Sequence, residues 1–274
     1  MKRTLLWGML SGVMLVFTPG ALAEDLPSAD DVISRYVKAI GGMEKLKAAK
    51  SRRMQGKFVM GGGQMEAPTT LEIERPNKFR VEFTFQGVTG TQAYDGKIGW
   101  FVMPFTGKSD PEKMAPDDLK EVEDQSDIDG PLIDYKDKGH KVEMAGKEDS
   151  DGAPAYKLKV TKKSGDVESY FIDAEQYMLV KVKGSRSVQG TEVDFEQIFS
   201  NYKPVEGVLI AHAIETRGGP MGGGMTMTFD KIETNVAFPA DRFTMPEPKK
   251  EEPKKEEGEP KKDGADKKPE PAKP

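Results

Sequence analysis

The feature that most constrains this chain is an alternation of apolar and charged residues that recurs from about residue 52 to about residue 233. The stretches KFRVEFTF at 78–85 and AYKLKVT at 155–161 alternate in this way, and VDFEQIF at 193–199 does so through Val193, Phe195 and Phe199. Successive side chains of a β-strand point to opposite faces, so each stretch predicts a strand with one apolar face and one charged face. Such strands are typical of an antiparallel sheet that has one side in water, and the other side needs a cover.

The pattern predicts about twelve strands with ordinary turns between most of them. The expected ranges are 52–60, 65–75, 78–86, 89–95, 97–103, 140–148, 155–162, 167–173, 177–186, 189–201, 207–217 and 225–233. Only the link at 104–139 is long. In it Asp110 can cap a helix, Pro111 can take the first helical position, and Leu119 and Val122 form a weak apolar stripe, so we expect a helix and an irregular return.

Two further helices are expected before the first strand. Ser28 is a suitable N-cap, and apolar residues follow it at helical spacing up to Ile40. Gly41 and Gly42 break this helix, and a second short helix is expected from Met43 to Lys50. The fold class that follows is α+β, a single curved antiparallel sheet with covering helices on its concave face.

The two ends of the chain are not expected to belong to the folded domain. Lys2 and Arg3 precede an apolar run and Ala23 closes an Ala-Leu-Ala triplet, so residues 1–23 are expected to be an export signal that is cleaved near Ala23. Residues 246–274 contain almost only Lys, Glu, Asp, Pro, Gly and Ala, which predicts a disordered tail. This tail is either a solvated terminus or a spacer that contacts the cell wall. Residues 24–245 are expected to form one domain.

Composition argues against several functions. The 274-residue chain has no cysteine, two histidines and a net charge of −5. An exported chain without cysteine has no disulfide, thiol nucleophile or lipid-modified cysteine, and an acidic chain is a poor partner for nucleic acid or anionic membranes. His212 shares its parity with apolar neighbours, which favours a core histidine. The acidic cluster at 117–127 matches no calcium loop and reads as a solvated helix face. We therefore expect a monomer without catalytic residues, metal or cofactor.

A triple glycine flanked by methionine occurs twice, as MGGGQM at 60–65 and as GGPMGGGM at 218–225. Alternate links of an up-and-down sheet lie at the same end, so twelve strands would bring both segments and the 104–139 insert to one rim, which carries Met60, Met65 and Met221. Three interpretations remain open: an adaptable rim for apolar ligands, flexible hairpin tips, or a Cu(I) site. Dense Met-x-x-Met spacing is absent, which disfavours copper.

The strand parity also selects a set of residues that would face the covered side and could contact an apolar ligand. These are Val81, Phe83, Phe85, Trp100, Val102, Ile172, Phe195, Ile210, Met225, Met227 and Phe229. A filled core and a ligand cavity use the same residue types, so the sequence leaves both possibilities open.

Several segments resemble bacterial outer membrane lipoprotein-sorting proteins, which are related to the periplasmic lipoprotein carrier LolA. They are AIGGMEKLKAAKSRRMQGKF (39–58), AYDGKIGWFVMPFTG (93–107), DIDGPLIDYKDKGHKVEMAGKED (127–149), YFIDAEQYMLVKV (170–182) and NYKPVEGVLIAHAIET (201–216). The resemblance implies an incomplete antiparallel barrel whose helices plug the concave side and leave an apolar cavity for acyl chains. It also implies a periplasmic protein of a bacterium with two membranes.

Two functions follow from this reading. The first is a periplasmic, non-enzymatic protein that binds lipid or lipoprotein acyl chains and takes part in lipoprotein sorting to the outer membrane. The second is an interaction or sensor module with the same fold and a filled cavity, which contacts an envelope protein.

Overall fold

The computed structural model describes residues 26–188, 190–218 and 224–248. The expected export signal, most of the expected tail and Met221 lie outside these residues. Thirteen strands follow one another in the order β6-β5-β4-β3-β2-β1-β13-β12-β11-β10-β9-β8-β7. Within the described part of the chain they form one antiparallel sheet with β6 and β7 as its edge strands. The predicted single antiparallel sheet with helices is confirmed.

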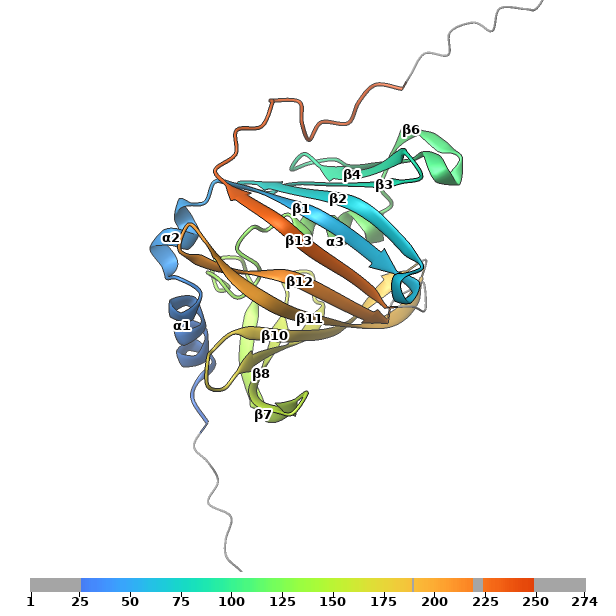
Figure 1. The fold of residues 1–274 in the computed structure, drawn as a ribbon. Coiled ribbons are helices and arrows are strands. Elements are labelled where there is room, and N and C mark those ends of the chain that lie inside the picture. Colours follow the sequence, from blue (N-terminus) through green and yellow to red (C-terminus); the bar gives the residue numbers. More distant parts are fainter. Residues whose placement is uncertain (1–25, 189, 219–223, 249–274) are drawn as a thin grey trace, which may run out of the picture. The chain divides into compact units, whose positions relative to one another are not determined.

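The helices and strands have the following bounds (Figure 1). The helices are α1 (Ala29–Ala39), α2 (Met43–Ala48) and α3 (Pro116–Gln125), with short 3-10 turns η1 (Gly61–Gly63) and η2 (Pro104–Thr106). The strands are β1 (Ser51–Met60), β2 (Met65–Glu74), β3 (Lys78–Phe85), β4 (Val88–Tyr94), β5 (Gly99–Met103), β6 (Lys108–Lys113), β7 (Lys141–Ser150), β8 (Ala153–Thr161), β9 (Val167–Asp173), β10 (Leu179–Val188), β11 (Thr191–Val205), β12 (Val208–Gly218) and β13 (Met225–Thr234).

The chain divides into two compact units. In the described residues, unit 1 comprises 26–47 and 131–218 and holds α1 and β7–β12. Unit 2 comprises 48–130 and 224–248 and holds β1–β6, α3 and β13. Each unit has its own hydrophobic core.

The core of unit 1 lies between its sheet and α1. Ser28 accepts a hydrogen bond from the backbone N–H of Asp31 at 3.1 Å, and the Asp31 carboxylate accepts from the Ser28 N–H, which completes a capping box. The helix then directs Val32 and Ile33 into the core. Gly41 follows with φ of +125°, and a Cβ there would lie 2.4 Å from the Gly207 carbonyl oxygen, so only glycine fits this approach.

The insert at 104–139 differs from the prediction. Lys108–Lys113, expected to begin a helix, forms β6 beside β5, and α3 begins only at Pro116 with Asp117 and Asp118 in its first turn. Proline is tolerated at the first position of a helix, and Pro111 is tolerated in β6 because an edge strand needs no donor on its free side. The described residues therefore contain thirteen strands, where twelve were expected.

Candidate functional site

The strand registers of unit 2 define two faces of its sheet. Phe79, Val81 and Phe83 lie opposite Ile73, Leu71 and Thr69 of β2, and those residues continue onto β1 and β13. We call this the apolar face of unit 2. The predicted residues that the registers place on it are Val81, Phe83, Phe85, Met225, Met227 and Phe229.

The helix α3 covers one end of this apolar face. Ile73, Phe79 and Tyr94 are buried there in one cluster with Val122, which is fully buried. The helix contacts β3, β4 and β5, and Leu119 approaches the backbone of Gly99 so closely that a Cβ there would lie 2.9 Å from it. In Figure 1, α3 lies behind the strands of unit 2. This end of the apolar face is a filled core.

The other end of the apolar face carries apolar side chains that remain partly accessible to solvent. We call this group the tip patch, and it consists of Phe58, Phe83, Phe85, Phe105, Met225 and Met227. The ring centroids of Phe58 and Phe83 are 6.5 Å apart, and those of Phe83 and Phe105 are 5.5 Å apart. Phe105 itself is 43% exposed. Exposed apolar groups of this kind mark binding surfaces in soluble proteins.

Gly90 makes the ring packing of the tip patch possible. It lies opposite Phe83 in the register of β3 and β4. A Cβ on Gly90 would lie 2.7 Å from the ring of Phe105 and 2.8 Å from the ring of Phe83. Both rings therefore lie directly against the backbone of β4. Gly90 lies within the expected strand 89–95, but the sequence pattern assigned no role to it, to Phe58 or to Phe105.

The prediction that Trp100 and Val102 share the face of Phe83 is wrong. The register pairs Trp100 with Ala93 and Val102 with Thr91, and these two residues of β4 pair with Arg80 and Glu82. Trp100 and Val102 therefore lie on the opposite face, which we call the charged face of unit 2. Phe101, which pairs with Gln92 of β4, is the β5 residue that lies on the apolar face instead.

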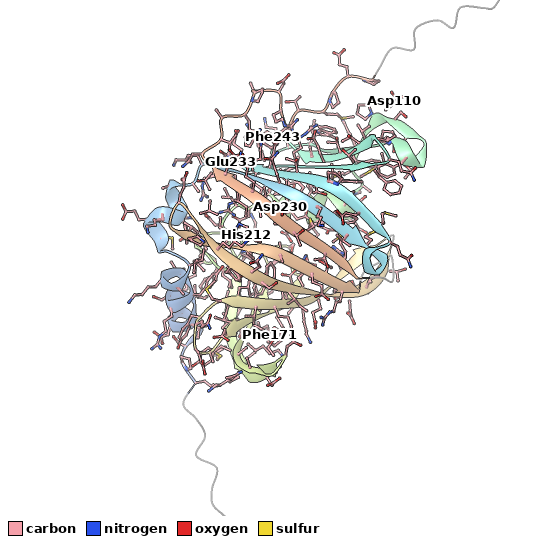
Figure 2. The ribbon with its side chains drawn as sticks, viewed as in Figure 1. Asp110, Phe171, His212, Asp230, Glu233 and Phe243 are labelled. Carbon is pink, nitrogen blue, oxygen red and sulfur yellow. The ribbon has the colours of Figure 1, made fainter. Side chains whose placement is uncertain are left out.

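Trp100 is nevertheless buried, because a segment after β13 covers it. Its indole N–H donates to the Phe243 carbonyl oxygen at 2.9 Å, and Phe243 is 2% exposed. The ring of Phe243, which is labelled in Figure 2, meets that of Phe238 edge-on with the ring centroids 5.4 Å apart. Sequence reasoning gave residues 235–248 no structural role, although two phenylalanines and an arginine between the last strand and the charged tail are the signal that could have indicated one.

An ionic network fixes the same segment to the charged face. Glu72 is 1% exposed, and it accepts hydrogen bonds from Arg53 at 2.8 Å and from Arg242 at 2.5 Å. Arg242 also donates to Glu82 at 2.8 Å, and Arg80 donates to Glu82 at 2.6 Å. Burial alone would raise the pKa of the Glu82 carboxyl, but the hydrogen bonds from Arg242 and Arg80 outweigh it and hold that pKa below its usual range.

A polar groove also lies on the charged face of unit 2. Its lining includes Gln55, Thr70, Thr84 and Thr89, and the hydroxyl oxygens of Thr84 and Thr89 are 2.9 Å apart. Such a lining offers hydrogen bonds but little apolar contact, so it is poorly suited to an acyl chain.

In unit 1 the equivalent apolar residues are mostly enclosed. Ile172 is fully buried in the core, and Ile210 is 8% exposed. Phe195 packs partly buried against the same core, with the Arg186 guanidinium 5.5 Å from its ring. His212, which is labelled in Figure 2, is 5% exposed, and its Nδ1 lies 2.9 Å from the Ile210 carbonyl oxygen, so its buried ring has a backbone hydrogen-bond partner.

The rim methionines of unit 2 meet at the turn between β1 and β2. Met60 lies opposite Met65 on one side and opposite Met225 on the other. Figure 1 shows the β1–β2 turn and the start of β13 at the same end of the sheet. The expectation that the whole insert lies at this rim is wrong, because α3 covers the end of β3–β5 that carries Phe79 and Tyr94.

Within the described ranges, no group of three His, Cys, Asp or Glu residues is placed to hold a metal ion. None of the helices there is long and apolar enough to cross a membrane.

Comparisons with known proteins bear on the fold. No protein-family model matches the sequence, and no curated protein does. A candidate outer membrane lipoprotein-sorting protein domain from Vibrio parahaemolyticus is similar in structure, with a TM-score of 0.53 and 12% identity over 79% of this chain and 97% of that domain. The LolA superfamily protein NE2245 from Nitrosomonas europaea has a TM-score of 0.54 and 13% identity over 80% of this chain and 98% of its own.

A third solved structure is similar to the same degree. The DUF1329 family protein from Desulfovibrio piger ATCC 29098 has a TM-score of 0.55 and 10% identity, over 78% of this chain and 96% of its own. Identities this low show the fold alone. The antiparallel sheet, its strand order and these three structures together establish that the chain has a LolA-like fold.

Proposed function

We propose that this protein is an exported, periplasmic, non-enzymatic protein that binds lipid or lipoprotein acyl chains through the tip patch of unit 2. The observation that carries the proposal is the partly exposed row of Phe58, Phe83 and Phe105 at the end of the apolar face that α3 does not cover. The LolA-like fold supports it, because one of the similar structures is described as a candidate lipoprotein-sorting domain.

The physical basis is the transfer of methylene groups from water to an apolar surface. Each buried methylene contributes about 0.8 kcal/mol, so an acyl chain that covers the patch gains several kcal/mol. Met225 and Met227 add unbranched, polarizable side chains that adapt to chains of different shape. Such binding needs no catalytic group, since it requires only apolar contact and exclusion of water.

The first test is identification of the natural ligand. The protein is purified from the envelope of its own bacterium without detergent, extracted with organic solvent, and the extract is analysed by mass spectrometry. We expect a lipid or acylated species in a fixed ratio to protein. The proposal would be contradicted if the extract contained no such species and the lipid-free protein did not bind acyl probes.

The second test locates the binding surface. We expect Met227→Gln to weaken binding of a fluorescent long-chain fatty acid about tenfold, which is a loss of about 1.4 kcal/mol. The matched control is Ile98→Gln. Ile98 is 37% exposed in the turn before β5, outside the tip patch. Equal weakening by both substitutions would show that the probe does not use the tip patch.

An envelope interaction module is the alternative function. Its support is the core of unit 1, in which Leu158, Val160 and Ile172 are fully buried. Crosslinking from the tip patch to one defined envelope protein, with no lipid in the extract, would favour this function over the first.

A further inference from the structure

Three methionines from separate parts of the sequence lie side by side on the apolar face of unit 2. Met60 ends β1, Met65 begins β2 and Met225 begins β13. The registers place Met60 directly opposite Met65 and directly opposite Met225. Residues opposite each other on adjacent antiparallel strands have Cβ atoms about 4.5–5.5 Å apart. Three flexible thioether side chains therefore occupy neighbouring positions on the apolar face of unit 2.

We propose that Met60, Met65 and Met225 form a binding site for a soft monovalent cation, Cu(I) or Ag(I), with the three thioether sulfurs as ligands. Thioethers are soft ligands that select Cu(I), whereas carboxylates and carbonyls prefer harder ions. Each methionine side chain has three rotatable bonds, so the sulfurs can converge on one ion without movement of the backbone.

The surroundings of the three side chains fit such a site. All three methionines are partly exposed, so an ion can reach them from solvent. The next pair on the same face of β1 and β13 is Phe58 opposite Met227, so apolar side chains lie beside the site. The chain contains no cysteine that could compete for a soft metal. Spacing along the sequence argued against copper, but the pairing of β1 with β13 brings together residues that the sequence separates.

This inference goes beyond acyl-chain binding and does not depend on it. The three methionines would bind a metal ion by coordination through their sulfur atoms, whereas the tip patch would bind an acyl chain by burying apolar surface. Metal binding is therefore measured on protein that has been extracted free of lipid, with the metal ion as the probe.

The experiment is a titration of the full mature chain with Ag(I) by calorimetry, and with Cu(I) under anaerobic conditions against a chromogenic Cu(I) chelator. We expect one ion per chain. The variant Met60→Leu should lose this binding, because Met60 is the central member of the trio. Met65→Leu and Met225→Leu should each weaken it. Leucine conserves volume, and circular dichroism before and after the substitutions checks the fold.

The matched control is Met43→Leu. Met43 is an exposed methionine at the start of α2, with 39% of its surface accessible. This variant should bind as the unchanged protein does. Binding that survives replacement of all three trio methionines would overturn the proposal, and so would an unchanged protein that takes up no ion.

The pH dependence gives an independent readout. Histidine, cysteine and carboxylate ligands must lose a proton to bind a metal, so their affinity falls in acid. A thioether has no proton to lose. We therefore expect the same affinity at pH about 5 as at pH about 8. An affinity that drops steeply over this range would assign the ion to other ligands and contradict the three-thioether site.

Discussion

The apolar faces of the two units are built from the same alternating pattern, yet they differ in how much of their surface is buried. In unit 1, α1 covers strands β7–β10, and Leu158, Val160 and Ile172 have no exposed surface. In unit 2, α3 covers only the end that carries Phe79 and Tyr94. The position of the covering helix therefore decides which apolar side chains are buried and which stay exposed to solvent, since the strands of both units alternate in the same way.

The largest effect that this comparison predicts is in unit 1. Leu158→Ala should lower the free energy of unfolding by about 2–5 kcal/mol, because it leaves a cavity in a filled core. Met227→Ala in the tip patch should cost clearly less, because Met227 is already partly exposed. Urea unfolding of both variants measures the two losses. Equal losses would mean that the tip patch is as closed as the core of unit 1.

The second prediction concerns the cover on the charged face of unit 2. Arg242→Met should destabilise the protein by about 1–3 kcal/mol, since Glu72 and Glu82 each lose a charged partner while partly or fully buried. The control is Arg217→Met, which should destabilise the protein less, because the Arg217 side chain is exposed and solvent screens its ion pairs with Glu196 and Glu215. If the two variants melt alike, residues 235–248 do not hold unit 2 together.

A third prediction tests α1 as the cover of unit 1. Ser28→Ala removes the hydroxyl that caps the helix and should cost about 1 kcal/mol. Ser28→Asp keeps an N-cap acceptor and should cost less. Thermal unfolding compares the two variants. A Ser28→Ala protein as stable as the unchanged chain would indicate that the helix does not depend on this cap.

The smallest expected effect is the acid sensitivity of Glu82. Its pKa in the folded protein lies below the ordinary value of 4.5. A carboxyl with a depressed pKa stabilises the fold above that ordinary value, and the stabilisation disappears as pH falls through the lower, folded-state pKa. The melting temperature of Glu82→Gln should therefore fall less than that of the unchanged protein when the pH is lowered from neutral to about 3. Parallel curves for the two proteins would argue against this role.

Much of the fold could be predicted because the alternation in stretches such as 78–85 is unambiguous. The assignment of Trp100 failed for a physical reason. Residues 100–103, WFVM, are four consecutive apolar residues, so a period of two does not tell which of them face inward. The actual face depends on the register with β4 and on Phe243, which covers Trp100 from far along the chain.

The candidate site was only partly predictable for a related reason. Phe83 and Met227 follow from parity, but Phe105 lies in a 3-10 turn where parity has no meaning. The helix of the insert was expected from Pro111 because Asp110 and Pro111 form a good start signal, yet the pairing of β6 with β5 took precedence. Local start signals do not decide between two elements when a neighbouring strand offers backbone hydrogen bonds.

The pairing of β1 with β13 has a consequence for how the polypeptide acquires its structure. Unit 2 is completed only when distant parts of the chain meet, as in the contact of Arg242 with Glu72, 170 positions apart. Strands β7–β12 instead join neighbours in sequence through short hairpins. Contacts between sequence neighbours form with a smaller entropic penalty, so strands β7–β12 should pair early, whereas unit 2 should remain open until the residues from β13 to Arg242 have been synthesised.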